Sequence, residues 1–392
     1  MSRVALLLPR PLYPERSGGE IRVASLVRAL SGRHRFTLLT FAQPGSRLLA
    51  EAAAAAVERS TGARVVLVWR SGAPPAPGLP ELARGFSDPA MEAALGALAA
   101  SERPDLVALE FSQMAQYAGA AARVAPVVLT EHDASVLSPA ASYYRGGRGP
   151  AERALLRSYL KDAFARCARV VAVSAADAKR LAPLARPGAV SVVATGVDLA
   201  RFAFAPLEGR RPGEAVFVGH YPHYPNEEAA VRLCRDILPR LARLAPARLR
   251  LVGSGPTPAV RALAAADVEV AGEVEDVAPE LRRARVFLAP MRLGFGIKGK
   301  VLEAMACGTP VVASPRACEA LPGVRPGAHL LVARDARAFA AAASRVLRDD
   351  ALAARLAAAG RSYVEARFGW DRQAELLDEV YRSVREEAAC GA

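Results

Sequence analysis

Lysine, cysteine and aromatic residues are all scarce in this chain of 392 residues, and the cysteine and aromatic shortages argue against whole classes of protein. The five cysteines are scattered and form no C-x-x-C pair, which argues against a disulfide framework and a structural zinc site. Aromatic residues make up 6% of the chain and do not alternate with basic ones, so we expect no nucleic-acid partner. No uncharged run of about 18 apolar residues occurs, so we expect no membrane span.

The N-terminal apolar run Val4–Leu8 is too short for the hydrophobic region of a signal peptide, and it predicts a first strand. The formal net charge is +13, and most of the positive charge is arginine. A surface this basic attracts anionic partners such as lipid headgroups or nucleotides. We therefore expect a cytoplasmic protein that can lie peripherally on the anionic inner face of the membrane.

Short apolar runs alternate with longer helical patterns from end to end, and this alternation is typical of parallel sheets covered by helices on both faces. The predicted strands are Val4–Leu8, Arg35–Thr40, Arg64–Val68, Leu106–Glu110, Val127–Thr130, Val170–Val173, Val190–Val193, Ala215–Val218, Arg248–Val252, Val268–Ala271, Val286–Ala289, Val311–Ala313 and Leu330–Ala333. The series divides at Ala203–Gly213, a segment rich in proline, glycine and charge. The sequence thus predicts two doubly wound α/β domains.

Two of the four lysines lie close together, in the glycine-rich loop Gly294–Lys300 that precedes an expected helix from Val301. Lysine is a compact charge suited to phosphate, and glycines let backbone N–H groups approach an anion at a helix start. The loop therefore predicts a phosphate or diphosphate site. The alternative is a solvent-exposed basic turn.

Two further side chains are candidates for a site. Glu303 is expected in the first turn of the helix from Val301, where a carboxylate can accept two hydroxyls of a ribose or hexose or, alternatively, complement the helix dipole. His132 follows a strand end between Glu131 and Asp133. It is a candidate site residue, and the alternative is a capping or core histidine.

The stretch Gly294–Ser314 resembles the donor-binding signature of glycosyltransferases of the GT-B fold, in particular family 4 (the glycosyl transferases group 1). Other segments are similar to the family in order and spacing, and together they cover most of the chain: Ser17–Glu20, Thr130–Asp133, Val173–Ser174, Gly196–Asp198 with Phe202, Val216–Gly219 with Tyr224–Asn226, Leu249–Pro256, Gly272–Val277 and Phe368–Trp370.

The resemblance implies a fold and a division into domains. The fold would be GT-B, with two Rossmann-like domains facing each other across a cleft. Residues 1–203 would form the N-terminal acceptor-binding domain and residues 204–369 the C-terminal nucleotide-sugar-binding domain. A final helix, residues 370–392, would pack back on the N-terminal domain. Its amphipathic pattern extends over Asp371–Glu387.

The resemblance also implies a site. His132 would face the transferred sugar, Lys298 would neutralise the leaving diphosphate, and Glu303 would bind the ribose. The residues expected to bind the donor are Gly18, Gly19, Gly219, Gly253, Val277, Gly294, Phe295, Gly296, Ile297, Lys298, Gly299, Lys300, Val301 and Glu303. The resemblance implies retention of anomeric configuration by a front-face mechanism, with no cofactor. No Asp-x-Asp motif lies in a suitable loop, so we expect no metal.

The chain departs from the family pattern at two places. The family often carries a sugar-contacting Glu eight residues before Glu303, where this chain has Phe295. Many members also carry an Arg and a Lys after the first C-domain strand, where His220–Asn226 has neither. We hypothesise that Lys298 and Lys300 replace that missing charge.

The sequence thus predicts a glycosyltransferase that moves a hexose from a UDP- or GDP-sugar to a saccharide or lipid-linked acceptor, in cell-surface polysaccharide or glycoconjugate synthesis. A basic N-domain region, Tyr144–Pro150 with the following helix, suits a lipid-linked acceptor, and an ordinary solvated helix face is the alternative. The rival functions are a nucleotide-sugar epimerase or hydrolase, and a non-catalytic nucleotide-sugar-binding protein.

Overall fold

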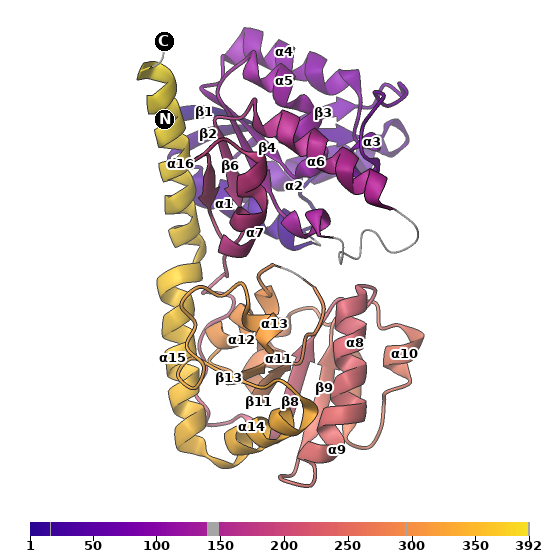
Figure 1. Cartoon of the computed structure of the whole chain (residues 1–392), viewed down its shortest axis with the longest axis vertical. Helices are drawn as coiled ribbons and strands as arrows, with labels where there is room; N and C mark the ends of the chain where they lie inside the picture. The colour runs from indigo at the N-terminus through magenta and orange to yellow at the C-terminus, as the bar shows by residue number, and fades with distance from the viewer. Residues whose placement is uncertain (16, 139–148, 295, 391–392) are drawn as a thin grey trace. The chain divides into compact units, whose positions relative to one another are not determined.

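The computed structural model describes residues 1–15, 17–138, 149–294 and 296–390 of the chain. At Pro44 and Ser135 it describes the backbone alone. The chain forms two compact units, Met1–Thr195 with Trp370–Ala392, and Gly196–Gly369. Each unit contains one parallel sheet with helices packed on it, as Figure 1 shows. Every predicted strand is present, most of them within one or two residues of the expected bounds.

The sheet of the first unit has seven parallel strands in the order β3-β2-β1-β4-β5-β6-β7. The strands are β1 Ser2–Leu8, β2 His34–Ala42, β3 Arg64–Trp69, β4 Leu106–Glu110, β5 Val127–Glu131, β6 Arg169–Ala172 and β7 Val190–Val192. The α-helices are α1 Gly18–Leu30, α2 Arg47–Thr61, α3 Glu81–Arg84, α4 Pro89–Glu102, α5 Ala118–Ala122, α6 Pro150–Phe164, α7 Ala175–Leu181 and α16 Trp370–Cys390. Short 3-10 turns span Pro44–Ser46, Ser112–Tyr117, Ala134–Leu137 and Ala182–Leu184.

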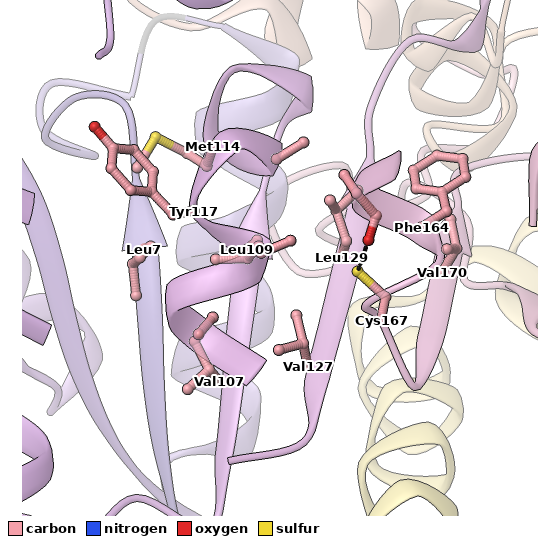
Figure 2. Packing of buried hydrophobic residues seen from close by; sticks show 14 of the residues in the cluster. Leu7, Val107, Leu109, Met114, Tyr117, Val127, Leu129, Phe164, Cys167 and Val170 are labelled. Atoms are coloured by element: carbon pink, nitrogen blue, oxygen red, sulfur yellow. Dashed lines mark hydrogen bonds between the residues drawn. The ribbon is translucent and has the colours of Figure 1, made fainter. Parts of the chain in front are cut away.

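Alternation of apolar side chains along the buried strands divides the core of this unit into two layers. One layer collects Leu7, Leu109 and Leu129 under Met114, Tyr117 and Phe164, as Figure 2 shows from close by. The other collects Leu6, Ala108 and Val128 under α1 and α16. The strands are therefore covered on both faces, which explains why they are nearly continuous apolar runs in the sequence.

The final helix α16 packs on the first unit, beside α1. Its buried side chains Leu377, Tyr381 and Val384 contact the same apolar layer as α1. A polar contact adds to this packing, because Asp378 lies 2.8 Å from the Nε2 of the buried His34 at the start of β2. The C-terminal helix thus returns to the N-terminal domain.

The sheet of the second unit has six parallel strands in the order β10-β9-β8-β11-β12-β13. The strands are β8 Arg211–Val218, β9 Arg248–Val252, β10 Val268–Gly272, β11 Ala284–Ala289, β12 Val311–Ala313 and β13 Leu331–Val332. The α-helices are α8 Tyr224–Arg232, α9 Leu238–Leu241, α10 Pro258–Arg261, α11 Val277–Arg283, α12 Gly299–Ala306, α13 Pro315–Cys318, α14 Ala336–Arg348 and α15 Asp350–Phe368. A π-helical turn, Leu233–Ile237, connects α8 to α9.

The segment expected to be a linker, Ala203–Gly213, lies inside the second unit and packs tightly there. Its Arg210 is buried, and the guanidinium donates to the carbonyls of Ala205, Leu281, Ala284 and others. Burial lowers the pKa of Arg210 to about 10. The segment that the sequence indicates as a loose linker is therefore an ordered part of the second unit that leads into β8.

Both sheets have a topological switch point, where strands on either side lead in opposite directions. In the first sheet it lies between β1 and β4, and in the second between β8 and β11. Ligands of doubly wound sheets bind beyond the carboxyl ends of the strands at such points. The predicted site residues are therefore expected beyond the carboxyl ends of the strands at these two points.

Candidate active site

At the switch point of the first unit, His132 is held by a buried carboxylate. Its Nε2 lies 2.6 Å from Glu110 Oε2, at the end of the neighbouring strand β4. Only 9% of the His132 side chain and 3% of that of Glu110 are exposed. Burial lowers the pKa of His132, and the hydrogen bond to Glu110 opposes that shift. His132 is thus a buried imidazole bound to a carboxylate rather than a helix cap.

The ring of Phe111 covers one face of this imidazole. The two ring centroids lie 3.8 Å apart with an interplanar angle of 17°. Phe111 adopts a positive φ of 72°, which is costly for a residue with a side chain. The phenyl ring stacks on His132 and also lies close to Gly19 in the first turn of α1.

Gly19, in that first turn, must be a glycine because of this ring. A Cβ at position 19 would lie 2.5 Å from Phe111 Cε1, closer than atoms pack, whereas a Cβ at Gly18 would meet nothing within 4 Å. Ser17 and Glu20 cap the helix reciprocally, with Ser17 Oγ accepting from Glu20 N. Gly19 therefore allows the start of α1 to approach His132, and Gly18 leaves the open side clear.

Two more charged groups lie buried under this edge. Arg22 of α1 is 1% exposed, and its Nη2 donates to the Val193 carbonyl at 2.9 Å. Its positive charge interacts with Glu110 and with Tyr381 of α16. Glu131, next to His132, accepts from Ser112 Oγ, and burial raises the pKa of Glu131 to about 7. The sequence reasoning did not identify Glu110 or Arg22, because neither lies in a recognisable motif.

At the switch point of the second unit, glycines bring two strand ends into contact. A Cβ at Gly253, after β9, would lie 1.9 Å from the carbonyl oxygen of Gly219, after β8. A Cβ at Gly219 would lie 3.0 Å from that of Asn226, which is buried at the start of α8. Gly253 is thus required for close backbone packing, and Gly219 allows the side chain of Asn226 to approach closely. Both have a structural role in addition to the predicted donor contact.

Lys298 and Lys300 of the glycine-rich loop lie at this same end of the sheet. Lys300 Nζ donates to Asn226 Oδ1 at 2.6 Å and lies 4.6 Å from the centre of the Phe217 ring. Lys298 is buried, and its Nζ donates to the Gly296 carbonyl at 3.2 Å. Gly294 and Gly296 both have positive φ, at 88° and 68°. Burial lowers the pKa of Lys300 to about 7, and the nearby Lys298 adds to the effect.

Glu303 lies two residues further along α12 than expected. The helix begins at Gly299 rather than Val301, so Glu303 is in the second turn and is not a charge at the helix start. Burial raises the pKa of Glu303, and the charges of Lys300 and Arg201 oppose that shift. Arg201 also forms an ion pair of 3.0 Å with Asp276, the residue that caps α11 before Val277. The sequence reasoning missed Arg201 and, as a site residue, Asn226.

The structure thus groups the predicted residues in two clusters, one at each switch point. His132, Gly18 and Gly19 belong to the first unit, and the remaining described donor residues, Ile297 and Val301 included, belong to the second. Phe295 lies outside the described residues. Within the described part of the chain, no group of three or more His, Cys, Asp or Glu side chains is arranged to hold a metal. None of the described helices combines the length and apolar character needed to span a bilayer.

The profile of "Glycosyltransferase Family 4" matches residues 16–201, and that of "Glycosyl transferases group 1" matches residues 212–349. The chain is 32% identical to the phosphatidyl-myo-inositol mannosyltransferase of Mycolicibacterium smegmatis, over 66% of this chain and 65% of that protein. It is 32% identical to a D-inositol 3-phosphate glycosyltransferase of Kineococcus radiotolerans, over 67% of this chain and 68% of that protein.

Among solved structures, sucrose-phosphate synthase from Thermosynechococcus elongatus superimposes with a TM-score of 0.73, at 20% identity, over 98% of this chain and 99% of that one. The two sheets and their covering helices thus define a GT-B fold, and the two matched relatives are named as glycosyltransferases. The chain belongs to glycosyltransferase family 4, the glycosyl transferases group 1.

Proposed function

We propose that the protein moves a hexose from a nucleotide diphosphate sugar to a saccharide or lipid-linked acceptor, with retention of configuration and without a metal or cofactor. The observation that carries the proposal is the lysine loop at the switch point of the second unit. Two lysines, several glycines and the start of α12 lie together there, and this combination suits a diphosphate.

In this proposal the bond between the sugar and the diphosphate breaks, and its electron pair goes to the leaving phosphate. Lys298 and Lys300 neutralise the charge that develops there. The acceptor hydroxyl oxygen bonds to the anomeric carbon on the same face, and its proton goes to the leaving phosphate. The chain's own residues then supply position and charge rather than a nucleophile.

Thermal unfolding with UDP, GDP, ADP and their sugar conjugates tests donor binding. A ligand at about 100 times its Kd should add roughly 2.7 kcal/mol to the free energy of unfolding. A shift with one nucleotide series would identify the base. No shift with any series would overturn the proposed donor site.

Turnover assays then separate the rival functions. Transfer to an added acceptor, with the product's anomeric configuration read by NMR, supports a retaining transferase. Release of free sugar or an isomer without acceptor would support a hydrolase or epimerase. Donor binding without turnover for any acceptor would support a binding protein. A rate unchanged by chelators would support independence from metal.

For the acceptor, we propose a lipid-linked molecule at an anionic membrane, met by the first unit. A cavity of about 760 Å³ lies at the carboxyl end of its sheet. Its lining includes the apolar side chains of Phe41 and Leu49 and three arginines, Arg10, Arg59 and Arg70. This composition suits an amphiphile with an anionic group. Beside it, Leu48 and Leu49 in the first turn of α2 are 82% and 75% exposed.

The other candidate surface offers less support. The segment 139–148 lies outside the described residues, so most of Tyr144–Pro150 is not placed. In the helix that follows, Arg157 and Lys161 are exposed, as an ordinary solvated face would be. Arg169 contacts Ser383 of α16, so it is engaged within the protein.

Co-sedimentation with vesicles tests the membrane partner. We expect binding to vesicles containing phosphatidylglycerol and a loss of about tenfold or more when Leu48 and Leu49 are both changed to Ser, since each exposed leucine contributes roughly 1.5–3 kcal/mol when buried. Leu244→Ser, at an exposed leucine of the second unit, is the matched control. Equal binding by all three proteins would contradict the proposed surface.

A further inference from the structure

The contact between His132 and Glu110 bears on which nitrogen of the imidazole carries the proton. A neutral imidazole carries one proton, and the hydrogen bond made by one ring nitrogen decides the role of the other. Glu110 Oε2 lies 2.6 Å from His132 Nε2. A carboxylate accepts hydrogen bonds, so this contact places the proton on Nε2.

Glu110 is itself held from two sides. Thr130, on β5, donates its hydroxyl to Glu110 Oε1 at 3.1 Å. The charge of the buried Arg22 interacts with the carboxylate, and within the described residues the Nε and Nη1 atoms of Arg22 have no hydrogen-bond partner. Arg22 therefore acts on Glu110 through charge rather than by competing for its oxygens. The carboxylate can turn its second oxygen to His132.

The other ring nitrogen faces the start of α1. A Cβ built on Gly19 would lie 3.4 Å from His132 Nδ1, and one built on Gly18 would meet no atom within 4 Å. Phe111 stacks on the imidazole face at 3.8 Å, which restrains rotation of the ring. Nδ1 is thus the nitrogen that faces Gly19 at the start of α1, next to the open space beside Gly18.

From this arrangement we infer that Glu110 is a positioning residue that keeps the proton of His132 on Nε2, so that Nδ1 accepts a hydrogen bond from a hydroxyl of the transferred sugar. The inference rests on the proposed transfer reaction for its ligand. It assigns His132 the role of an acceptor that orients the sugar. The ring need not gain or lose a proton in the reaction.

Burial supports this role. It lowers the pKa of His132, which favours the neutral ring with a free electron pair on Nδ1. Glu110 and Arg22 are the charged groups that act on the ring, with opposite signs. A protonated ring would have no acceptor left for the sugar hydroxyl.

Long-range ¹H–¹⁵N spectra of the whole protein, labelled at its five histidines, test the tautomer directly. The His132→Gln variant identifies the signal by its loss. In the wild type we expect a pyridine-like Nδ1 and a pyrrole-like Nε2 for His132. A protonated Nδ1 with a bare Nε2 would overturn the inference.

Variants of Glu110 test its role. In Glu110→Gln the amide can donate to Nε2, so the proton can move to Nδ1. We expect a mixed or reversed tautomer and a fall in kcat of about tenfold or more, with a smaller change in the donor KM. Thr130→Val, which releases Glu110 Oε1 and keeps the carboxylate, should give a partial shift of the same kind.

The matched control is Glu131→Gln, which changes a buried carboxylate on the next strand whose oxygens bind Ser112 Oγ and Asp133 N. We expect it to leave the His132 tautomer unchanged. If Glu110→Gln folds with an unchanged tautomer and kcat, Glu110 has no positioning role. The spectra need no donor, so a protein with the expected tautomer and no turnover would refute the proposed reaction while sustaining the role of Glu110.

Discussion

The clusters at the two switch points differ in how their polar groups are satisfied. In the first unit, His132 contacts the carboxylate of Glu110 and the ring of Phe111, so its orientation is fixed in the absence of ligand. In the second unit, Lys300 donates to the neutral amide of Asn226, and its pKa is lowered to about 7. One cluster is therefore held in place by its neighbours, whereas the charge of the other depends on whether Lys300 is protonated.

This difference predicts how each cluster responds to a substitution or to a change of pH. A preorganised group depends on the shape of its neighbours, so small steric changes should matter most there. A buried lysine depends on the charge beside it, so binding of a diphosphate should be coupled to uptake of a proton. Four predictions test this difference between the two clusters.

Removing both lysines of the loop should have the largest effect. In the Lys298→Ala, Lys300→Ala double variant we expect donor affinity to fall by about 100-fold or more, because each charge-assisted hydrogen bond to phosphate contributes roughly 1.5–3 kcal/mol. Isothermal titration with the donor measures the loss. The other two lysines, Lys161 and Lys179, provide the control double variant. Near-normal donor affinity in the loop variant would refute the diphosphate role.

The displaced pKa of Lys300 should make donor binding depend on pH. Bound diphosphate favours the protonated amine, so affinity should fall by about tenfold or more between roughly pH 7 and pH 9. Lys300→Arg should flatten this profile, because arginine stays charged. Without ligand the sign reverses for folding: the unfolded amine titrates near 10.5, so this group makes the protein more stable as pH rises from about 7 toward 10.5. A wild-type binding profile as flat as the variant's would contradict the proposed coupling.

A methyl group at Gly19 should test the preorganised cluster. Gly19→Ala would force Phe111 to move, and we expect the free energy of unfolding to fall by about 1–3 kcal/mol. Gly18→Ala, one residue away in open space, is the stability control. Denaturant unfolding of both variants measures the difference. Equal stability of the two variants would show that Phe111 can move away from position 19 at little cost in free energy, contrary to the prediction.

Glu131 should give a pH dependence of stability in the opposite direction from that of Lys300. Its pKa is raised from 4.5 to about 7, so the folded state holds a proton that the unfolded chain has lost. Stability should therefore fall as pH rises from about 4.5 to 7 and should fall less in Glu131→Gln. Unfolding curves across this range check the slope. An identical slope in the variant would assign the pH dependence to other groups.

Much of the fold could be predicted from the sequence, because buried parallel strands are continuous apolar runs. Leu106–Glu110, Arg248–Val252 and Val311–Ala313 have the predicted bounds, and the amphipathic pattern from Asp371 marks the final helix. The linker was harder to predict. Proline and glycine in Ala203–Gly213 indicate a loose segment, but the buried hydrogen bonds of Arg210 depend on distant carbonyls that no local pattern reveals.

The grouping of candidate site residues could be predicted where the residues are close in sequence. The glycines and lysines of the loop are close in sequence, and they lie together at one edge. Glu110 and Arg22 were not predictable, since they approach His132 only when β4, β5 and α1 meet. The start of α12 was also misplaced, because Gly299 and Lys300 look like loop residues until the helix is seen to begin there.

The return of α16 to the first unit bears on the order in which the chain can fold during synthesis. The second unit, Gly196–Gly369, is continuous and is translated before α16. The first unit is discontinuous in sequence, and Val23 and Val27 of α1 share an apolar cluster with Leu377 and Tyr381 of α16. This part of the core therefore cannot be completed until α16 has been synthesised, after the whole of the second unit.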